Sequence, residues 1–166
     1  MNRPGAPYRF NPLASARDAA LTCAAASGLL LLAALGFEYL GGLLPCQLCI
    51  WQRWPHLLVI LAGLLVWKAR SAALLLAAGG ALASAAIALY HVGVEQAFWP
   101  GPKGCSASLD IGGDLASLTD RLLATPVVRC DEIAWSFLGL SMAGWNMVAS
   151  LAIAALALQA LVKAHR

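Results

Sequence analysis

The sequence predicts an all-α integral membrane protein whose four transmembrane helices form a bundle. Of the 166 residues, 61% are hydrophobic and only 11% are charged, and the mean hydropathy is +0.75. This composition is typical of chains that fold in lipid. A helix needs about 20 apolar residues to cross the hydrocarbon core of a bilayer, and four runs of about this length are present. We therefore expect one membrane domain over residues 1–166 and no separate soluble domain.

The four apolar runs are each predicted to span the membrane. The first is too long for the hydrophobic region of a cleaved signal peptide. Small residues in the third, LLLAAGGALASAA, allow close helix approach. Tryptophans at several predicted span ends would place an indole ring in the membrane interface. The predicted spans cover residues 19–39, 50–67, 72–89 and about 136–162, and the two outer loops cover residues 40–49 and 91–135.

The distribution of Lys and Arg predicts that both termini are cytoplasmic, because positive residues are retained on that side of a membrane. Of the eleven Lys and Arg residues, seven lie in the two tails and in the link after the second span. The other four lie in the outer loops or at the outer ends of the spans, together with seven of the eight acidic residues. The net charge of +3 therefore reflects topology and does not indicate a nucleic-acid partner.

The predicted topology sorts the five cysteines. Cys23 lies inside the first span, where a small apolar core role is expected. Cys46 and Cys49 lie in the first outer loop, and Cys105 and Cys130 in the second. In an oxidising compartment proximity favours disulfides Cys46–Cys49 and Cys105–Cys130, although four cysteines permit three pairings. A C-x-x-C pair is typical of a redox centre, whereas the second pair could equally be a structural staple.

Metal binding is the competing interpretation of four thiols. Zinc sites commonly combine two closely spaced cysteine pairs, but Cys105 and Cys130 are far apart in sequence and the compartment is oxidising. Covalent haem attachment needs a histidine directly after the second cysteine, where the chain has Ile50. We therefore expect redox chemistry and no metal.

Arg53 is the fixed charge nearest the C-x-x-C pair. It follows Cys49 by four residues, so in a continuous helix both side chains project from one face. A cation beside a thiol at a membrane interface stabilises the thiolate, because the low local dielectric strengthens the attraction. The alternative is an arginine that reaches out to lipid headgroups.

Two histidines lie at the outer side of the predicted spans. His56 is one turn beyond Gln52, and His91 follows the third span. Either imidazole could donate a proton or a hydrogen bond to a small electron acceptor, and either could be an ordinary interfacial side chain.

The stretch PCQLCIWQR, the pair Cys105 and Cys130 in a long second outer loop, and four spans with both ends inside resemble the DsbB family. Members of that family are thiol oxidases of the bacterial inner membrane, which pass electrons from a periplasmic dithiol protein to a quinone. The resemblance covers nearly the whole chain, although Gln52 stands where the family usually has an acidic residue. It implies that the outer side is the periplasm.

The resemblance also implies a role for each site residue. A reduced DsbA-like protein of thioredoxin fold would attack Cys105, and the freed Cys130 would pass the electrons to Cys46. Cys49 would become the thiolate that meets the quinone ring, while Arg53 would hold the ring or stabilise its charge. Ubiquinone or menaquinone would then leave as quinol into the lipid.

The long outer loop contains DLASLTDRLLATP, residues 114–126, in which leucines recur at helical spacing. This pattern predicts a short amphipathic helix that lies on the membrane surface or packs against the bundle.

Two other functions fit parts of the pattern. A quinone reductase similar to vitamin K epoxide reductase would carry its C-x-x-C pair in a late span. A membrane scaffold stapled by disulfides would tolerate Cys49→Ser and Arg53→Lys with little loss beyond stability.

Overall fold

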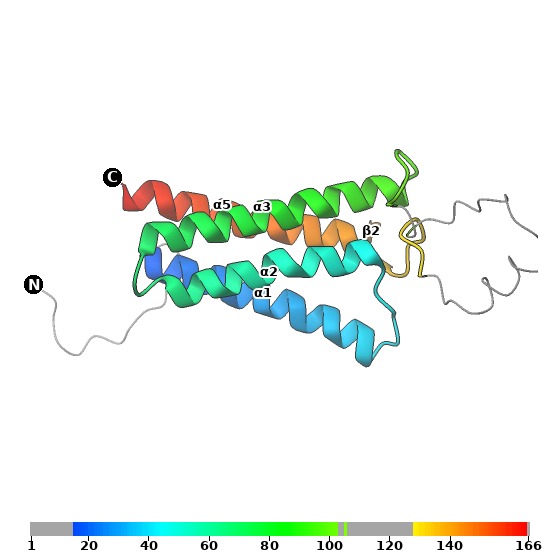
Figure 1. Cartoon of the computed structure of the whole chain (residues 1–166), viewed down its shortest axis with the longest axis horizontal. Coiled ribbons are helices and arrows are strands. Elements are labelled where there is room, and N and C mark those ends of the chain that lie inside the picture. Colours follow the sequence, from blue (N-terminus) through cyan, green and yellow to red (C-terminus); the bar gives the residue numbers. More distant parts are fainter. Residues whose placement is uncertain (1–14, 103–104, 106–127, 166) are drawn as a thin grey trace, which may run out of the picture.

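The computed structural model describes residues 15–102, 105 and 128–165. Within these ranges four long helices run antiparallel in a bundle, and a two-stranded hairpin precedes the last of them (Figure 1). The elements are α1 (Ala16–Tyr39), α2 (Gln47–Leu65), α3 (Arg70–Glu95), β1 (Ser136–Phe137), β2 (Leu140–Ser141) and α5 (Met142–Ala164). All four helices are long and apolar enough to cross a membrane, which confirms the predicted four-helix membrane bundle.

The antiparallel order gives the bundle two chemically different ends. The start of α1, the link between α2 and α3, and the end of α5 share one end (Figure 1). At this end the Arg17 guanidinium lies 4.9 Å from the centre of the Trp67 ring, a cation–π contact. The hairpin and the start of α2 lie at the opposite end (Figure 1).

Side chains cap the starts of three of the four long helices among the described residues. The Ser15 hydroxyl accepts a hydrogen bond from the Asp18 amide at 3.1 Å, and the Ser141 hydroxyl accepts one from the Gly144 amide at 3.1 Å. At the start of α2 the capping group is a thiol: the Cys46 sulfur accepts a hydrogen bond from the Cys49 amide at 3.2 Å. These acceptors satisfy amides that have no partner inside their own helix.

The structure corrects the predicted bounds of the second and third spans. The second was expected to start at residue 50, but α2 begins at Gln47, so Cys49 lies in its first turn instead of in the loop. The third was expected to end at residue 89, but α3 continues to Glu95 and includes His91. The physical reason in the first case is the Cys46 cap, which a hydropathy pattern does not detect.

The predicted start of the fourth span near residue 136 is also wrong, since residues 136–141 form the β1–β2 hairpin. Leu138 and Gly139 form the turn with positive φ angles of 51° and 79°, a conformation that a helix does not contain. The Trp145 indole nitrogen donates to the Phe137 carbonyl oxygen at 3.0 Å and fastens the hairpin to α5. The amphipathic helix predicted for residues 114–126 lies outside the described residues.

After α3 the chain folds back on the helix. The Trp99 indole nitrogen donates to the Tyr90 carbonyl oxygen at 2.8 Å, and the two rings stack with centroids 6.0 Å apart. The Trp99 ring occupies the space where a Cβ atom on Gly93 would stand. Glycine at position 93 therefore allows this segment to turn back toward the cysteine end.

Small residues let the helices pack closely. A Cβ atom on Gly63 of α2 would lie 2.5 Å from the Ala24 Cβ of α1, and one on Gly80 of α3 would lie 3.0 Å from the Pro55 carbonyl oxygen of α2. Cys23 is fully buried in the same core, as expected. Large apolar side chains face outward instead, where lipid would cover them.

Candidate redox site

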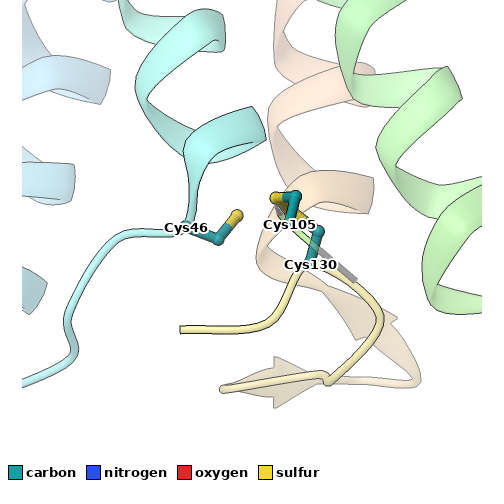
Figure 2. Close-up of side chains that lie close together, drawn as sticks. All are labelled: Cys46, Cys105 and Cys130. Atoms are coloured by element: carbon teal, nitrogen blue, oxygen red, sulfur yellow. A yellow bond between two sulfur atoms is a disulfide. The ribbon is translucent and has the colours of Figure 1, made fainter. Parts of the chain in front are cut away.

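Three of the cysteine side chains gather at one end of the bundle. Cys46, Cys105 and Cys130 are at most 5% exposed, and their sulfur atoms all lie within 4.8 Å of one another. Cys105 and Cys130 form a disulfide, and the Cys46 side chain points toward it from the start of α2 (Figure 2). The fold thus brings together thiols from both predicted outer loops.

Cys46 and Cys49 are free thiols in this structure. The two sulfurs lie 2.9 Å apart as a hydrogen-bonded pair. The first pair is therefore in its dithiol form while the second is oxidised. A disulfide between Cys46 and Cys49 remains a prediction for the oxidised state.

Local backbone contacts place the second pair against the first. The Cys105 amide donates to the Pro102 carbonyl oxygen at 3.0 Å, and the Cys130 amide donates to the Cys105 carbonyl oxygen at 2.7 Å. Both residues pack with Cys46, Leu48 and Val94 in one buried cluster. The loop cysteines are consequently seated on the ends of α2 and α3.

Electrostatics favour a thiolate at Cys46. The hydrogen bond with Cys49 lowers the pKa of Cys46 to about 4, against the effect of burial, and a hydrogen bond from His91 acts in the same direction. At neutral pH the reduced pair therefore holds one negative charge on or near the Cys46 sulfur. A thiolate is the form of cysteine that attacks disulfides.

Two cavities meet at the C-x-x-C pair. The larger has a volume of about 380 Å³ and is walled mainly by apolar and aromatic side chains. The smaller has a volume of about 50 Å³ and lies toward the second pair, next to Cys46 and Val128. Cys49, Arg53 and His91 line both cavities, whereas Cys46 lines only the smaller one. Cys49 thus stands between the second cysteine pair and the larger cavity.

Arg53 lies at the wall of both cavities and is held there by an acidic residue of α1. Its Nη1 atom donates to the Glu38 carboxylate at 2.6 Å, and the two side chains are 22% and 18% exposed. This contact ties the guanidinium to α1 beside both cavities. Sequence reasoning missed Glu38, although it is the only acidic residue inside a predicted span, and an ionisable group in a span commonly marks a functional site.

His91 contacts both cysteine pairs. Its Nε2 atom lies 3.6 Å from the Cys46 sulfur, and the ring is also within hydrogen-bonding reach of the Cys130 backbone. Glu95 lies one turn further along α3, with Oε1 at 3.9 Å from the same nitrogen. The ring is 3% exposed, so it is a buried neighbour of the thiols and not an interfacial side chain.

His56 lies deeper in the bundle than its sequence position suggested. It is 2% exposed, and its ring nitrogens contact Ser27 on α1 at 3.2 Å, Asn146 on α5 at 3.0 Å and Ser84 on α3 at 3.1 Å. His56 and Asn146 also line the larger cavity. Sequence reasoning missed these polar partners, because single serines and amides in an apolar run carry no signal of which way they face.

A metal ion has three potential ligands here, since the Cys46, Cys49 and His91 ligand atoms lie within 4.8 Å of one another. The imidazole orientation does not favour this use. The Gln52 amide nitrogen lies 2.9 Å from His91 Nδ1. If this amide donates to Nδ1, the ring proton is on Nε2, the nitrogen that faces Cys46, and a protonated nitrogen has no lone pair to offer a metal.

Comparison of the sequence with known proteins matches it to a family of disulfide bond formation proteins. The sequence profile described as "DsbB: Disulfide bond formation protein DsbB" matches residues 16–160. Disulfide bond formation protein B of Aeromonas salmonicida is 40% identical to this chain, over 73% of this chain and 74% of that protein. The protein of the same name from Methylococcus capsulatus is 35% identical over 83% and 87%, and the one from Stutzerimonas stutzeri is 30% identical over 91% and 98%.

Proposed function

Because the chain belongs to the DsbB family of disulfide bond formation proteins, we propose that it reoxidises a periplasmic DsbA-like dithiol protein and passes the electrons through two cysteine pairs to a membrane quinone. Family membership and the four apolar helices make it a multi-pass membrane disulfide oxidoreductase.

One observation carries the proposed route, which is the order of the sulfur atoms. The Cys105–Cys130 disulfide is followed by Cys46, within 4.8 Å, then by Cys49, at 2.9 Å from Cys46, and then by the larger cavity. Each exchange of thiolate and disulfide requires direct contact of sulfur atoms. This series supports two successive exchanges that end at Cys49.

In the proposed reaction a thiolate of the reduced partner attacks the Cys105 sulfur, forms a mixed disulfide and releases Cys130. The second partner thiol then resolves the mixed disulfide, which leaves the partner oxidised and this pair reduced. Cys130 attacks Cys46 of the oxidised first pair and releases Cys49 as a thiolate. Attack by Cys105 on Cys130 restores the second disulfide and leaves Cys46 and Cys49 reduced, which is the state described here.

The larger cavity fits a quinone ring, because its walls are apolar and aromatic and it is bordered by Cys49 and Arg53. A bound quinone accepts two electrons and two protons and leaves as quinol. Cys49 lines the cavity, and Arg53 has guanidinium N–H groups beyond the one that binds Glu38. These donors would bind a ring carbonyl oxygen. Ubiquinone and menaquinone both carry such a carbonyl.

We further propose that the cysteine end faces the periplasm in the bacterial inner membrane. The start of α1, the link from α2 to α3 and the end of α5 share the opposite end of the bundle (Figure 1). These segments contain Arg17, Lys68, Arg70 and Lys163, so this end would be cytoplasmic by the positive-inside rule. The relay would then join a partner in water to a quinone in lipid.

The proposal is tested with the purified full chain in detergent, a reduced DsbA-like protein and a soluble quinone, with quinol formation as the readout. Cys49→Ser and Cys105→Ser should each abolish turnover. Cys23→Ala is the matched control and should retain it, because Cys23 is buried away from the site and contacts the Ile153 carbonyl oxygen at 3.7 Å. Unchanged turnover in either site variant would favour a stapled scaffold instead.

A further inference from the structure

A chain of polar side chains, all buried except the partly buried Asn146, runs from the cysteine end into the middle of the bundle and takes no part in the thiol exchanges. The Gln52 Nε2 atom lies 2.9 Å from His91 Nδ1, and Asn146 Nδ2 donates to Gln52 Oε1 at 2.7 Å. At the far end Asn146 Oδ1 lies 3.0 Å from His56 Nε2. Gln52 is 6% exposed, so its amide depends on these protein partners.

The two amides give this chain a direction, because an amide nitrogen can only donate. The Asn146 amide nitrogen donates to Gln52 Oε1 at 2.7 Å and to the Ser84 hydroxyl oxygen at 3.1 Å. The amide oxygen of Asn146 therefore faces His56. Gln52 therefore accepts with its oxygen and presents its nitrogen to His91. The Nδ1 atom of His91 must be the acceptor of that bond.

The other ring nitrogen of His91 faces acceptors. Nε2 lies 3.6 Å from the Cys46 sulfur and 3.9 Å from Glu95 Oε1, and the Cys130 backbone is within hydrogen-bonding reach of the ring. Glu95 is itself fixed by the Ser141 hydroxyl, which donates to it at 2.5 Å. A neutral imidazole with one proton satisfies all these contacts only if the proton is on Nε2.

We propose that Gln52 and Asn146 are positioning residues that hold His91 as the Nε2–H tautomer, with its proton directed at the Cys46 sulfur. The bond between Cys46 and Cys49 re-forms when two electrons leave the pair for the quinone, which becomes quinol with one proton from the Cys49 thiol and one from water. Cys46 enters this step as a thiolate, and the His91 N–H donates to that sulfur. The catalytic consequence rests on the proposed function, whereas the tautomer does not.

The tautomer is measured on the reduced full chain in detergent without quinone, with ¹⁵N-labelled histidine. The chain has three histidines, so single substitutions assign each signal. In the unsubstituted chain Nε2 of His91 should be protonated and Nδ1 should not. Gln52→Glu preserves the size of the side chain but replaces the donor with an oxygen, so it should move a proton onto Nδ1. Ser150→Ala, at 3.5 Å from His56 Nε2, is the control and should leave the His91 signals unchanged.

Turnover gives a second readout. Gln52→Met keeps the volume of the side chain but removes its hydrogen-bond donor. The value of kcat should then fall roughly tenfold, the loss expected for one hydrogen bond that supports a charged group, here the Cys46 thiolate. The KM for the dithiol partner should stay unchanged. A proton on Nδ1 in the unsubstituted chain, an unprotonated Nδ1 in Gln52→Glu, or unchanged kcat in Gln52→Met would overturn the inference. If the unsubstituted chain shows no quinone-linked turnover, the proposed function fails while the tautomer result stands independently.

Discussion

Removing the Glu38 carboxylate should weaken quinone binding through its effect on Arg53. The carboxylate holds the guanidinium at the cavity wall by one charge-assisted hydrogen bond of 2.6 Å, and both side chains are about one-fifth exposed. Such a bond contributes about 1.5 to 3 kcal/mol when buried. Partial exposure reduces this to about 1 to 2 kcal/mol, or roughly 5- to 30-fold in an equilibrium constant. Without Glu38 the long Arg53 side chain can turn to lipid headgroups.

The assay is the apparent KM for a soluble quinone in a double-mutant cycle of Glu38→Gln and Arg53→Gln. Each single variant should raise KM by the stated factor, and the double variant should resemble Arg53→Gln alone, because Glu38 acts only through the arginine. Lys68→Gln at the opposite end of the bundle is a control for lost charge. An unchanged or lower KM in Glu38→Gln would refute the reasoning and show that the carboxylate competes with the quinone for Arg53.

Three further results are expected. Since the pKa of Cys46 is lowered from 9.0 to about 4, alkylation of this thiol in the reduced protein should persist at pH 6, and an alkylation rate that already falls as pH drops below 8 would contradict this. The stability that the lowered pKa contributes is present at higher pH and should be lost as pH falls through about 4. Gly93→Ala should displace Trp99, and faster proteolysis after α3 would report it. Gly63→Val should lower thermal stability by several degrees, because even a Cβ meets Ala24 at 2.5 Å; an unchanged melting temperature would show that α1 and α2 separate freely.

The four helices could be predicted from sequence because lipid imposes a minimum length on every span, and a run of apolar residues records that length directly. The same signal failed at residues 136–141, where SFLGLS is as apolar as the helix that follows. Only the Ser141 cap and the turn at Leu138 and Gly139 distinguish the hairpin, and both are local backbone features.

The cysteines and Arg53 could be singled out from sequence because thiols and fixed charges are rare in a chain of this composition. Their partners could not. The contact between Glu38 and Arg53 depends on how α1 and α2 are rotated against each other, and the contact of Gln52 with His91 depends on the packing of α2 against α3. Such rotations follow from small residues such as Gly63, whose effect appears only when the neighbouring helix is in place.

The central claim is that the first cysteine pair, and not the second, delivers electrons to the quinone. It is tested by a single turnover of fully reduced protein with soluble quinone and no dithiol partner. The variant with both Cys105→Ser and Cys130→Ser should still form one equivalent of quinol and a Cys46–Cys49 disulfide, whereas Cys49→Ser should form none. Loss of quinol in the first variant, or its retention in Cys49→Ser, would contradict the account.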